Sequence, residues 1–487
     1  MAARKDSYRS IDQRREIGLE AREKVPHASH EGWTPAPHRW DPVALLEDQD
    51  KTREVDLVPV RHARMSVSPF TFYRGTAKIM AADLAATPTA GLNVQLCGDA
   101  HLSNFGLYAS PERALVFDLN DFDETLPGPF EYDVARMAAS FTIAGRNNGF
   151  SPDDIRSATR TAVSSYRKAM TDFAGLDTMD VWYAHLAEDD LMKGVRRAAA
   201  ASATTKAQGK VAKTAVKRAA RIGSKAHERD SLQALSKLGE QVDGHYQIVS
   251  QPPIVVPARD LAAMYGISAE QMTEVIDLQL RSYRTTLQPD RRALLERFKI
   301  IDVARKVVGV GSVGTRAFIV LLQGRDESDP LFLQIKEATA SVLEDHLPES
   351  RFRNPGERVV QGQRLMQASS DIFLGWSKGV QAGYFYYWRQ LRDMKGSIDV
   401  ESMVPLGLDY YASICGWTLA RAHARSGDAV AIAAYLGDGK GFDRAIADFS
   451  ARYADQNDLD YQAFTAAIQS GRLEAAEEAT PVAMSSA

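Results

Sequence analysis

The stretches CGDAHLSNFG (residues 97–106) and NDFDETLPGPFEYD (residues 120–133) decide the fold. Two short apolar runs, 105–108 and 114–119, connect them, with the turn-forming sequence SPER between the runs. Apolar runs of this length around such a turn predict an antiparallel hairpin. A strand at 94–96 is expected to lead into the first stretch. One small supersecondary unit therefore gathers a His, an Asn and several Asp side chains.

These polar side chains have the spacing that phosphoryl transfer needs. Asp99 follows a glycine, and Asn104 lies five residues further along the chain. In such chemistry one carboxylate takes the proton of the attacking hydroxyl, while an amide oxygen and a second carboxylate hold Mg²⁺ on the nucleotide phosphates. We therefore predict Asp99 as the catalytic base with His101 beside it, and Asn104 and Asp121 as metal ligands.

Two spacings disagree about the main metal carboxylate. Asp118 lies nearer the usual distance after Asn104, whereas Asp121 fits better when counted back from Asp133. We favour Asp121 because the downstream stretch shares more residues with the pattern, and Asp123 is then a candidate second ligand. Three carboxylates this close repel one another unless a cation is bound. Asp133 is expected to accept backbone N–H bonds from the catalytic loop and to hold that loop in place.

A glycine-rich turn is expected over the phosphates. The sequence GVGSVG places Gly309, Gly311 and Gly314 at the G-x-G-x-x-G spacing. The same spacing opens a helix in dinucleotide-binding folds, but residues 315–322 (TRAFIVLL) are β-branched and apolar, so a strand is expected instead. Lys336 closes a third strand, LFLQIK, and can reach the α- and β-phosphates of ATP.

A carboxylate should pair with Lys336, as it does in protein kinases. Glu357 begins a predicted helix at 355–368, and Glu344 lies nearer in the sequence; we favour Glu357. The predicted strand at 384–391, followed by Arg392-Asp393, would form the hinge beside the adenine.

Six segments carry a family resemblance. Together they resemble an uncharacterised bacterial family, domain of unknown function 2252, over about residues 50–440: FYRGTAKIMAADL, CGDAHLSNFG, FDLNDFDETLPGPFEYDVARMAAS, VVGVGSVGTR, LFLQIKEA and LMQASSDIFLGW. That family looks similar to the protein-kinase-like superfamily, and its local motifs are closest to the aminoglycoside phosphotransferases. Those enzymes usually have His-Gly-Asp, whereas this chain has Cys97 before Gly98.

The resemblance implies an α+β, two-lobed, protein-kinase-like fold with extra helices. The glycine-rich segment follows the catalytic loop by about 200 residues, an order that predicts a circularly permuted fold, which exchanged termini and surface loops can tolerate. The expected parts are an N-terminal arm (1–60), a helical catalytic lobe (61–297), a β-rich nucleotide-binding lobe (298–396), C-terminal helices on the catalytic lobe (397–473) and a disordered tail (474–487).

The implied activity is an ATP- and Mg²⁺-dependent transfer of phosphate to a hydroxyl of a small molecule or a protein. Transfer of AMP to a protein would use the same carboxylates, because both reactions need phosphates held by a metal. A non-catalytic nucleotide-binding protein is a third alternative, against which the complete set of motif residues argues.

Composition argues against several classes of protein. The 487 residues carry a net charge of −4, so bulk charge does not indicate a nucleic-acid binder. Two cysteines cannot build a disulfide framework, the N-terminus lacks the apolar core of a signal peptide, and no apolar run is long enough to span a membrane. A cytoplasmic protein is expected. Residues 196–225 are basic without one acidic residue, which indicates a solvated helical pair or flexible insert, or else a docking surface for an acidic partner.

Overall fold

The computed structural model describes residues 9–476, apart from 204–205, 229–230, 243–244, 267, 308, 392–393 and 397. The hinge dipeptide expected at 392–393 and the tail beyond 476 therefore lie outside the described residues. The fold is mixed α+β, and its described strands form sheets of two, six, three and two strands.

Two small sheets carry the stretches that decide the fold. β1 (Asn93–Leu96) pairs antiparallel with β4 (Leu126–Pro129). β2 (Phe105–Ala109) and β3 (Leu115–Leu119) form the predicted hairpin, with Leu107 opposite Phe117. The predicted strand and hairpin are therefore confirmed, and the loops that bear the Asp side chains leave the ends of β1 and β3.

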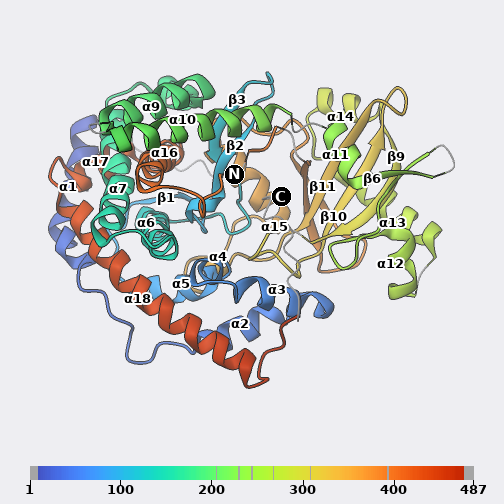
Figure 1. Cartoon of the computed structure of the whole chain (residues 1–487), viewed down its shortest axis with the longest axis horizontal. Coiled ribbons are helices and arrows are strands. Elements are labelled where there is room, and N and C mark those ends of the chain that lie inside the picture. The colour runs from blue at the N-terminus through green and yellow to red at the C-terminus, as the bar shows by residue number, and fades with distance from the viewer. Residues whose placement is uncertain are drawn as a thin grey trace.

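A six-stranded antiparallel sheet dominates the other half of the molecule, on the right in Figure 1. Its strands run in the order β12-β13-β11-β10-β9-β8, with these bounds: β8 (Val255–Pro257), β9 (Lys299–Lys306), β10 (Ala317–Gln323), β11 (Pro330–Glu337), β12 (Gly375–Lys378) and β13 (Phe385–Gln390). The predicted strands at 315–322, 331–336 and 384–391 are present as β10, β11 and β13. The run 303–310 (VARKVVGV) predicts a strand that reaches Val310, but β9 ends four residues earlier, at Lys306, before two glycines of positive φ, Gly309 and Gly314. The glycine-rich turn is correspondingly longer.

Helices build the half on the left in Figure 1. α6 (Phe130–Asn147) is buried along nearly its whole length, which its small residues allow. α7 (Pro152–Ala174) packs closely on α16 (Pro405–Ala424), because a Cβ at Gly416 would lie 2.2 Å from the carbonyl oxygen of Ala162. α18 (Gly441–Gln469) closes the outer side.

Four further helices cover the six-stranded sheet. They are α11 (Ser231–Leu238), α12 (Ala258–Tyr265), α13 (Ala269–Arg284) and α14 (Pro289–Leu295). Tyr283 of α13 stacks on Trp388 of β13 with ring centroids 4.5 Å apart. The sheet half thus begins well before residue 298, where the sequence placed its start, because the apolar faces of these helices fit the sheet rather than the other helices.

The N-terminal part wraps both halves. α1 (Ile11–Lys24) begins at a capping box on Ser10 and is followed by α2 (Pro42–Asp50) and α3 (Val58–Met65). The stretch 69–86 (PFTFYRGTAKIMAADLAA) has apolar residues at helix-like offsets that predict one helix, and that prediction is wrong. α4 (Pro69–Arg74) and α5 (Ala77–Leu84) are separated at Gly75, where a Cβ would lie 2.7 Å from the Met65 sulfur.

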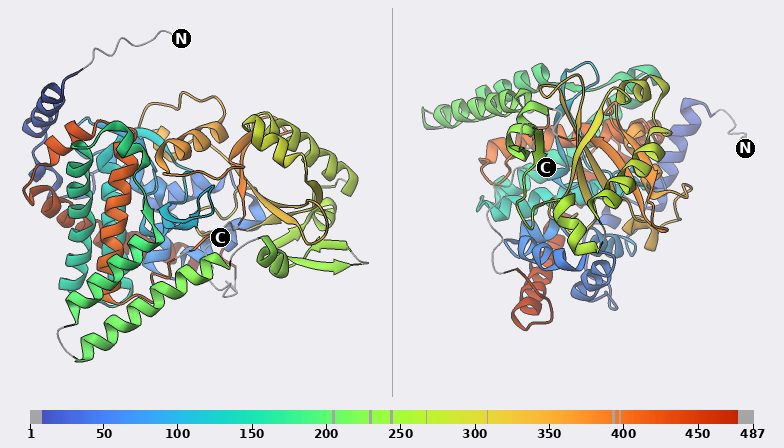
Figure 2. Two further views of the ribbon diagram at one scale, coloured as in Figure 1. Left: turned by 90° about the horizontal axis from the view of Figure 1, so that it is seen from above. Right: turned by 90° about the vertical axis from the view of Figure 1, so that its right-hand side faces the viewer.

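The basic segment 196–225 lies in a helical hairpin of α9 (Glu188–Ser202) and α10 (Lys206–His227). Figure 2 shows α10 as a long helix along the edge of the helical half. The remaining elements are η1 (His27–His30), η2 (Val55–Leu57), η3 (Leu102–Asn104), α8 (Thr178–Tyr183), β5 (Leu186–Ala187), β6 (Gly239–Val242), β7 (His245–Ile248), η4 (Val342–Asp345), α15 (Pro355–Met366) and α17 (Ala429–Leu436). Across the described residues, we find no helix with the length and apolar character needed to cross a membrane.

Candidate functional site

The loop that carries Asp99 is fixed by a buried carboxylate. Asp133, in the first turn of α6, accepts hydrogen bonds from the backbone N–H of Cys97 at 2.6 Å and of Gly98 at 2.9 Å. His423 Nε2 lies 3.1 Å from the same carboxylate. Gly98 has a φ of +85°, and a Cβ there would lie 2.2 Å from the Glu124 carbonyl oxygen, so the turn requires glycine.

Asp99 is held from one side. Arg136 Nε donates to its Oδ1 at 2.8 Å, whereas Oδ2 lies 3.8 Å from His101 Nε2. The Asn104 amide donates to the Asp99 carbonyl oxygen at 2.6 Å. Burial raises the pKa of Asp99, and Arg136 offsets this only in part. Burial, with Arg74 and Arg136, keeps the pKa of His101 well below its ordinary value, so its imidazole is neutral.

Asp121, Asp123 and Lys336 form one charged cluster. Lys336 Nζ lies 2.7 Å from Asp123 Oδ2 and 3.6 Å from Asp121 Oδ2, and the Tyr387 hydroxyl donates to Asp123 Oδ1 at 2.6 Å. Burial and the neighbouring Asp123 raise the pKa of Asp121. Burial also acts to raise the pKa of Asp123, but Lys336 and Tyr387 outweigh it and the net shift is downward. Burial alone would lower the pKa of Lys336, yet the two carboxylates raise it.

Asp118 lies outside the cluster formed by Asp121, Asp123 and Lys336. It is 1% exposed on β3, forms an ion pair with Arg421, and accepts the Ala368 backbone N–H at 2.8 Å. It does not line the cleft that contains Asp99. Of the two carboxylates that the spacings left open, the structure brings Asp121 to Lys336 and buries Asp118 in a structural ion pair.

A cleft of about 460 Å³ brings together several of the candidate residues, but Lys336, His101, Gly309 and Gly314 are not among the residues that line it. Asp99, Asn104, Asp121 and Asp123 line it together with Gly311 of the glycine-rich turn. Further wall residues come from the N-terminal part, within 48–53 and 74–78, and from the segment 337–342 at the end of β11. Residues separated by more than 200 positions in the sequence therefore share one polar space.

The glycine-rich turn is braced by the N-terminal helices. A Cβ on Gly311 would lie 2.9 Å from the Arg74 carbonyl oxygen, so the turn and the end of α4 approach closely. Arg64 donates to the Gly309 carbonyl at 2.6 Å, and Arg53 donates to that of Val313. The three glycines thus allow both the positive φ values at Gly309 and Gly314 and a close backbone approach.

Glu357 is not brought to Lys336. Within the part of the chain that the structure describes, the ion-pair partners of Lys336 are Asp121 and Asp123. Glu357 lies in the first turn of α15, and its neighbour Arg358 is the buried residue. Arg358 donates to the carbonyl oxygens of Asp123 at 2.7 Å and of Thr125 at 2.6 Å. These bonds join α15 to the loop 120–125, which carries Asp121 and Asp123 and is called the carboxylate loop below.

Sequence reasoning missed the arginines of the site. Arg136 holds Asp99, and Arg74 lines the cleft beside it with a buried Nε that has no hydrogen-bond partner among the described residues. Burial lowers the pKa of Arg74, with Glu401 and Asp99 opposing that shift. Arg74 precedes the catalytic loop in the sequence FYRGTAK, and its place in the cleft depends on the break at Gly75, which no local pattern revealed.

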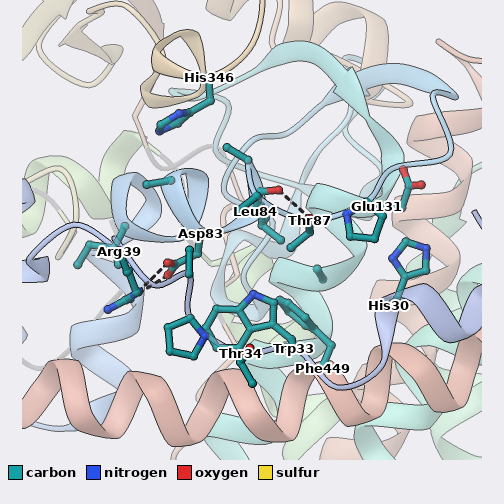
Figure 3. Close-up of a pocket in the computed structure, with 18 of the residues that line it drawn as sticks. His30, Trp33, Thr34, Arg39, Asp83, Leu84, Thr87, Glu131, His346 and Phe449 are labelled. Carbon is teal, nitrogen blue, oxygen red and sulfur yellow. Dashed lines mark hydrogen bonds and ion pairs between the residues drawn. The ribbon is translucent and has the colours of Figure 1, made fainter.

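A second pocket, of about 660 Å³, lies between the N-terminal arm and α5, α6 and α18. Figure 3 shows Trp33 and Phe449 on one side, the Arg39–Asp83 pair on another, and Glu131 and His30 on a third. Burial raises the pKa of Glu131 to about 7. None of the sequence-predicted site residues lines this pocket, so it is separate from the acidic cleft.

The described fold is mixed α+β, and its polar cleft is lined by Asp99, Asn104, Asp121, Asp123 and Gly311. The buried Lys336 forms ion pairs with Asp121 and Asp123. The chain belongs to the family described as "Uncharacterized protein conserved in bacteria (DUF2252)", whose model matches residues 53–467. No curated protein and no solved structure matches the chain.

Proposed function

We propose that this protein is an ATP- and Mg²⁺-dependent phosphotransferase that acts on a hydroxyl of a small molecule or a protein. One observation carries the proposal: Lys336 Nζ lies 3.6 Å from Asp121 Oδ2. Groups that hold the two ends of one triphosphate must lie within roughly 10 Å of each other. These two residues are 215 positions apart in the sequence, so only the fold brings them together.

The arrangement of the sheet half supports a kinase-like fold. The glycine-rich turn joins β9 to β10, Lys336 lies on the next strand, β11, and α15 follows before β12. In protein kinases a glycine-rich loop covers the phosphates, a lysine lies on the third strand, and a helix follows it. Because Asp99 precedes this unit in the chain, we propose a circular permutation of that fold.

The acidic residues fit a magnesium nucleotide. Among the described residues no three His, Cys, Asp or Glu side chains are grouped as a metal site, but Mg²⁺ on a nucleotide needs only one or two carboxylates, since phosphates and waters complete its shell. Asn104, Asp121 and Asp123 offer oxygen ligands in the same cleft. When bound, Mg²⁺ would neutralise charge on the phosphates.

Asp99 is proposed to take the proton of the acceptor hydroxyl. Its Oδ1 is engaged by Arg136, so Oδ2 is the oxygen left for that proton. A carboxylate whose pKa is raised by burial is a stronger base than an exposed one, and Arg136 opposes that rise in the pKa of Asp99. Arg74 lines the same cleft, its Nε has no hydrogen-bond partner among the described residues, and it would offer positive charge to phosphate oxygens.

The test compares ATP turnover and ATP binding in Asp99→Asn. With Mg²⁺ and labelled ATP, we expect the variant to lose about 100-fold or more of its turnover, because general-base catalysis contributes roughly that much, while its affinity for ATP stays within a few-fold. Glu112→Gln, on the exposed β2–β3 turn, is the control and should behave as the wild type. Wild-type turnover by Asp99→Asn would refute the base, and a product that gains AMP instead of phosphate would refute phosphate transfer.

A further inference from the structure

A third cavity, of about 680 Å³, lies under the α9–α10 hairpin. Its walls come from α9, α10, the start of α16, the 396–407 segment and the β2–β3 hairpin. Most of the side chains that line it are apolar, among them Leu107, Phe117, Leu191, Val195, Ile222 and Ile414. A cavity of this size and polarity is typical of small-molecule sites, which measure roughly 300–1,000 Å³.

Three cationic side chains and two carboxylates line this cavity, and the cations are gathered on α10. Arg218, Arg221 and Lys225 line it from α10, and all three side chains are exposed. Arg218 donates to the Ser402 carbonyl oxygen. The cavity therefore combines an apolar interior with a cationic rim.

The acidic residues of the lining are already engaged. Glu188 Oε2 lies 2.7 Å from His227 Nε2, and Asp399 Oδ1 accepts the Ser402 backbone N–H at 3.3 Å. The two helices meet tightly at this point, because a Cβ on Gly223 would lie 2.3 Å from Glu188 Oε1. Neither carboxylate ion-pairs with the cations of the rim in the described part of the chain, and Arg218 is engaged by Ser402, so Arg221 and Lys225 are the cations that an external anion would meet.

We propose that this cavity binds a single-chain lipid with an anionic head, of the long-chain fatty acid class. The acyl chain would lie among the apolar walls, and the carboxylate would lie at Arg221 and Lys225. An acidic protein surface fits less well, because it would leave the apolar interior unfilled. The inference does not rest on the proposed phosphotransferase activity, since none of the residues of the acidic cleft lines this cavity.

The experiment measures displacement of a fluorescent fatty acid by palmitate from the full-length protein. We expect saturable binding of one palmitate per chain. The double variant Arg221→Glu/Lys225→Glu should weaken palmitate binding at least tenfold. Lys213→Glu/Lys217→Glu is the matched control: it makes the same charge change on exposed positions of the same helix, outside the cavity lining, and should change the affinity less than twofold.

Two further measurements separate the parts of the proposal. Hexadecanol, which lacks the anionic head, should bind the wild type several-fold more weakly than palmitate and should be insensitive to the Arg221/Lys225 change. Ala219→Trp, which places a large ring in the lining, should abolish palmitate binding while the thermal unfolding curve stays that of a folded protein. Absence of saturable binding, equal losses in both double variants, or undiminished binding by Ala219→Trp would overturn the assignment, as would binding only to anionic vesicles.

Discussion

At the scale of single residues, the candidate site separates carboxylates that look alike in the sequence. Asp118 and Asp121 are three positions apart, but one lies within β3 and pairs with Arg421, and the other lies past the strand end beside Lys336. Spacing alone could not decide between them, because the decision depends on where β3 ends. The sequence did indicate the loop that holds Asp99 and the lysine opposite it. It could not indicate Arg74 or Arg136, whose roles arise from packing between helices.

This difference predicts opposite phenotypes for two alanine variants. Asp118→Ala leaves Arg421 buried without its carboxylate and should cost about 3–5 kcal/mol of unfolding free energy. Asp121→Ala leaves Asp123 paired with Lys336, so it should cost far less stability but abolish Mg²⁺-dependent ATP turnover. Urea unfolding and turnover measured on the same samples check the pair. A stable, inactive Asp118→Ala together with an unstable Asp121→Ala would contradict the placement of both residues.

At the scale of elements, secondary structure was predicted reliably where the signal lies in residues that follow one another in the sequence. The β2–β3 hairpin and the strands β10 and β11 follow from β-branched and apolar runs between turn residues. The break between α4 and α5 did not, because it depends on how closely Met65 approaches Gly75. The sequence also did not predict that α11–α14 pack on the six-stranded sheet. Helix periodicity indicates that a helix has a buried face, but it does not identify the element against which that face packs.

The turn after β1 gives a prediction at this scale. The cost of its left-handed backbone conformation can be measured separately from the cost of its close packing, by comparing two glycine substitutions. Gly98→Ala combines a φ of +85° with a contact of 2.2 Å between the new Cβ and the Glu124 carbonyl oxygen. We expect a loss of more than about 2 kcal/mol of unfolding free energy, because left-handed strain alone costs about 1–2 kcal/mol. Gly149→Ala is the matched control, with a φ of +68° and no atom within 4 Å of its Cβ, and should show only the strain. Equal losses in the two variants by chemical denaturation would show that the close approach at Gly98 does not matter.

At the scale of the whole molecule, the acidic cleft depends on contacts between the six-stranded sheet and segments that lie far from it in the sequence. Glu54, from the N-terminal part, pairs with Arg305 of β9 at 2.9 Å, and its backbone N–H donates to the Gly314 carbonyl at 2.7 Å. Arg389 of β13 donates to the Asn120 carbonyl at 3.0 Å. Each contact joins the six-stranded sheet to a segment that precedes it by more than 200 residues, so the sequence order conceals a site that the fold assembles.

Arg358 of α15 makes a further connection of this kind, through three hydrogen bonds. Its guanidinium, 2% exposed, donates to the carbonyl oxygens of Asp123, Thr125 and Thr339, and it thereby joins α15, the end of β11 and the carboxylate loop. Arg358→Ala would leave buried carbonyls unpaired at about 1–3 kcal/mol each. We therefore expect the unfolding free energy to fall by about 3 kcal/mol or more.

The loss of stability in Arg358→Ala should appear first near the arginine and only then across the whole protein. In Arg358→Ala, hydrogen exchange should quicken first in residues 121–125 and at the end of β11, because these backbones lose their shared donor. The affinity for ATP should fall with it, since Asp123 and Lys336 lie on the loosened segments. Arg325→Ala is the control: it removes an exposed arginine on the turn between β10 and β11, whose guanidinium pairs with the adjacent Asp326 at 2.7 Å, and it should leave both exchange and affinity unchanged. Uniform acceleration of exchange across the sheet in Arg358→Ala would mean that the arginine stabilises the sheet itself rather than its attachment to the carboxylate loop.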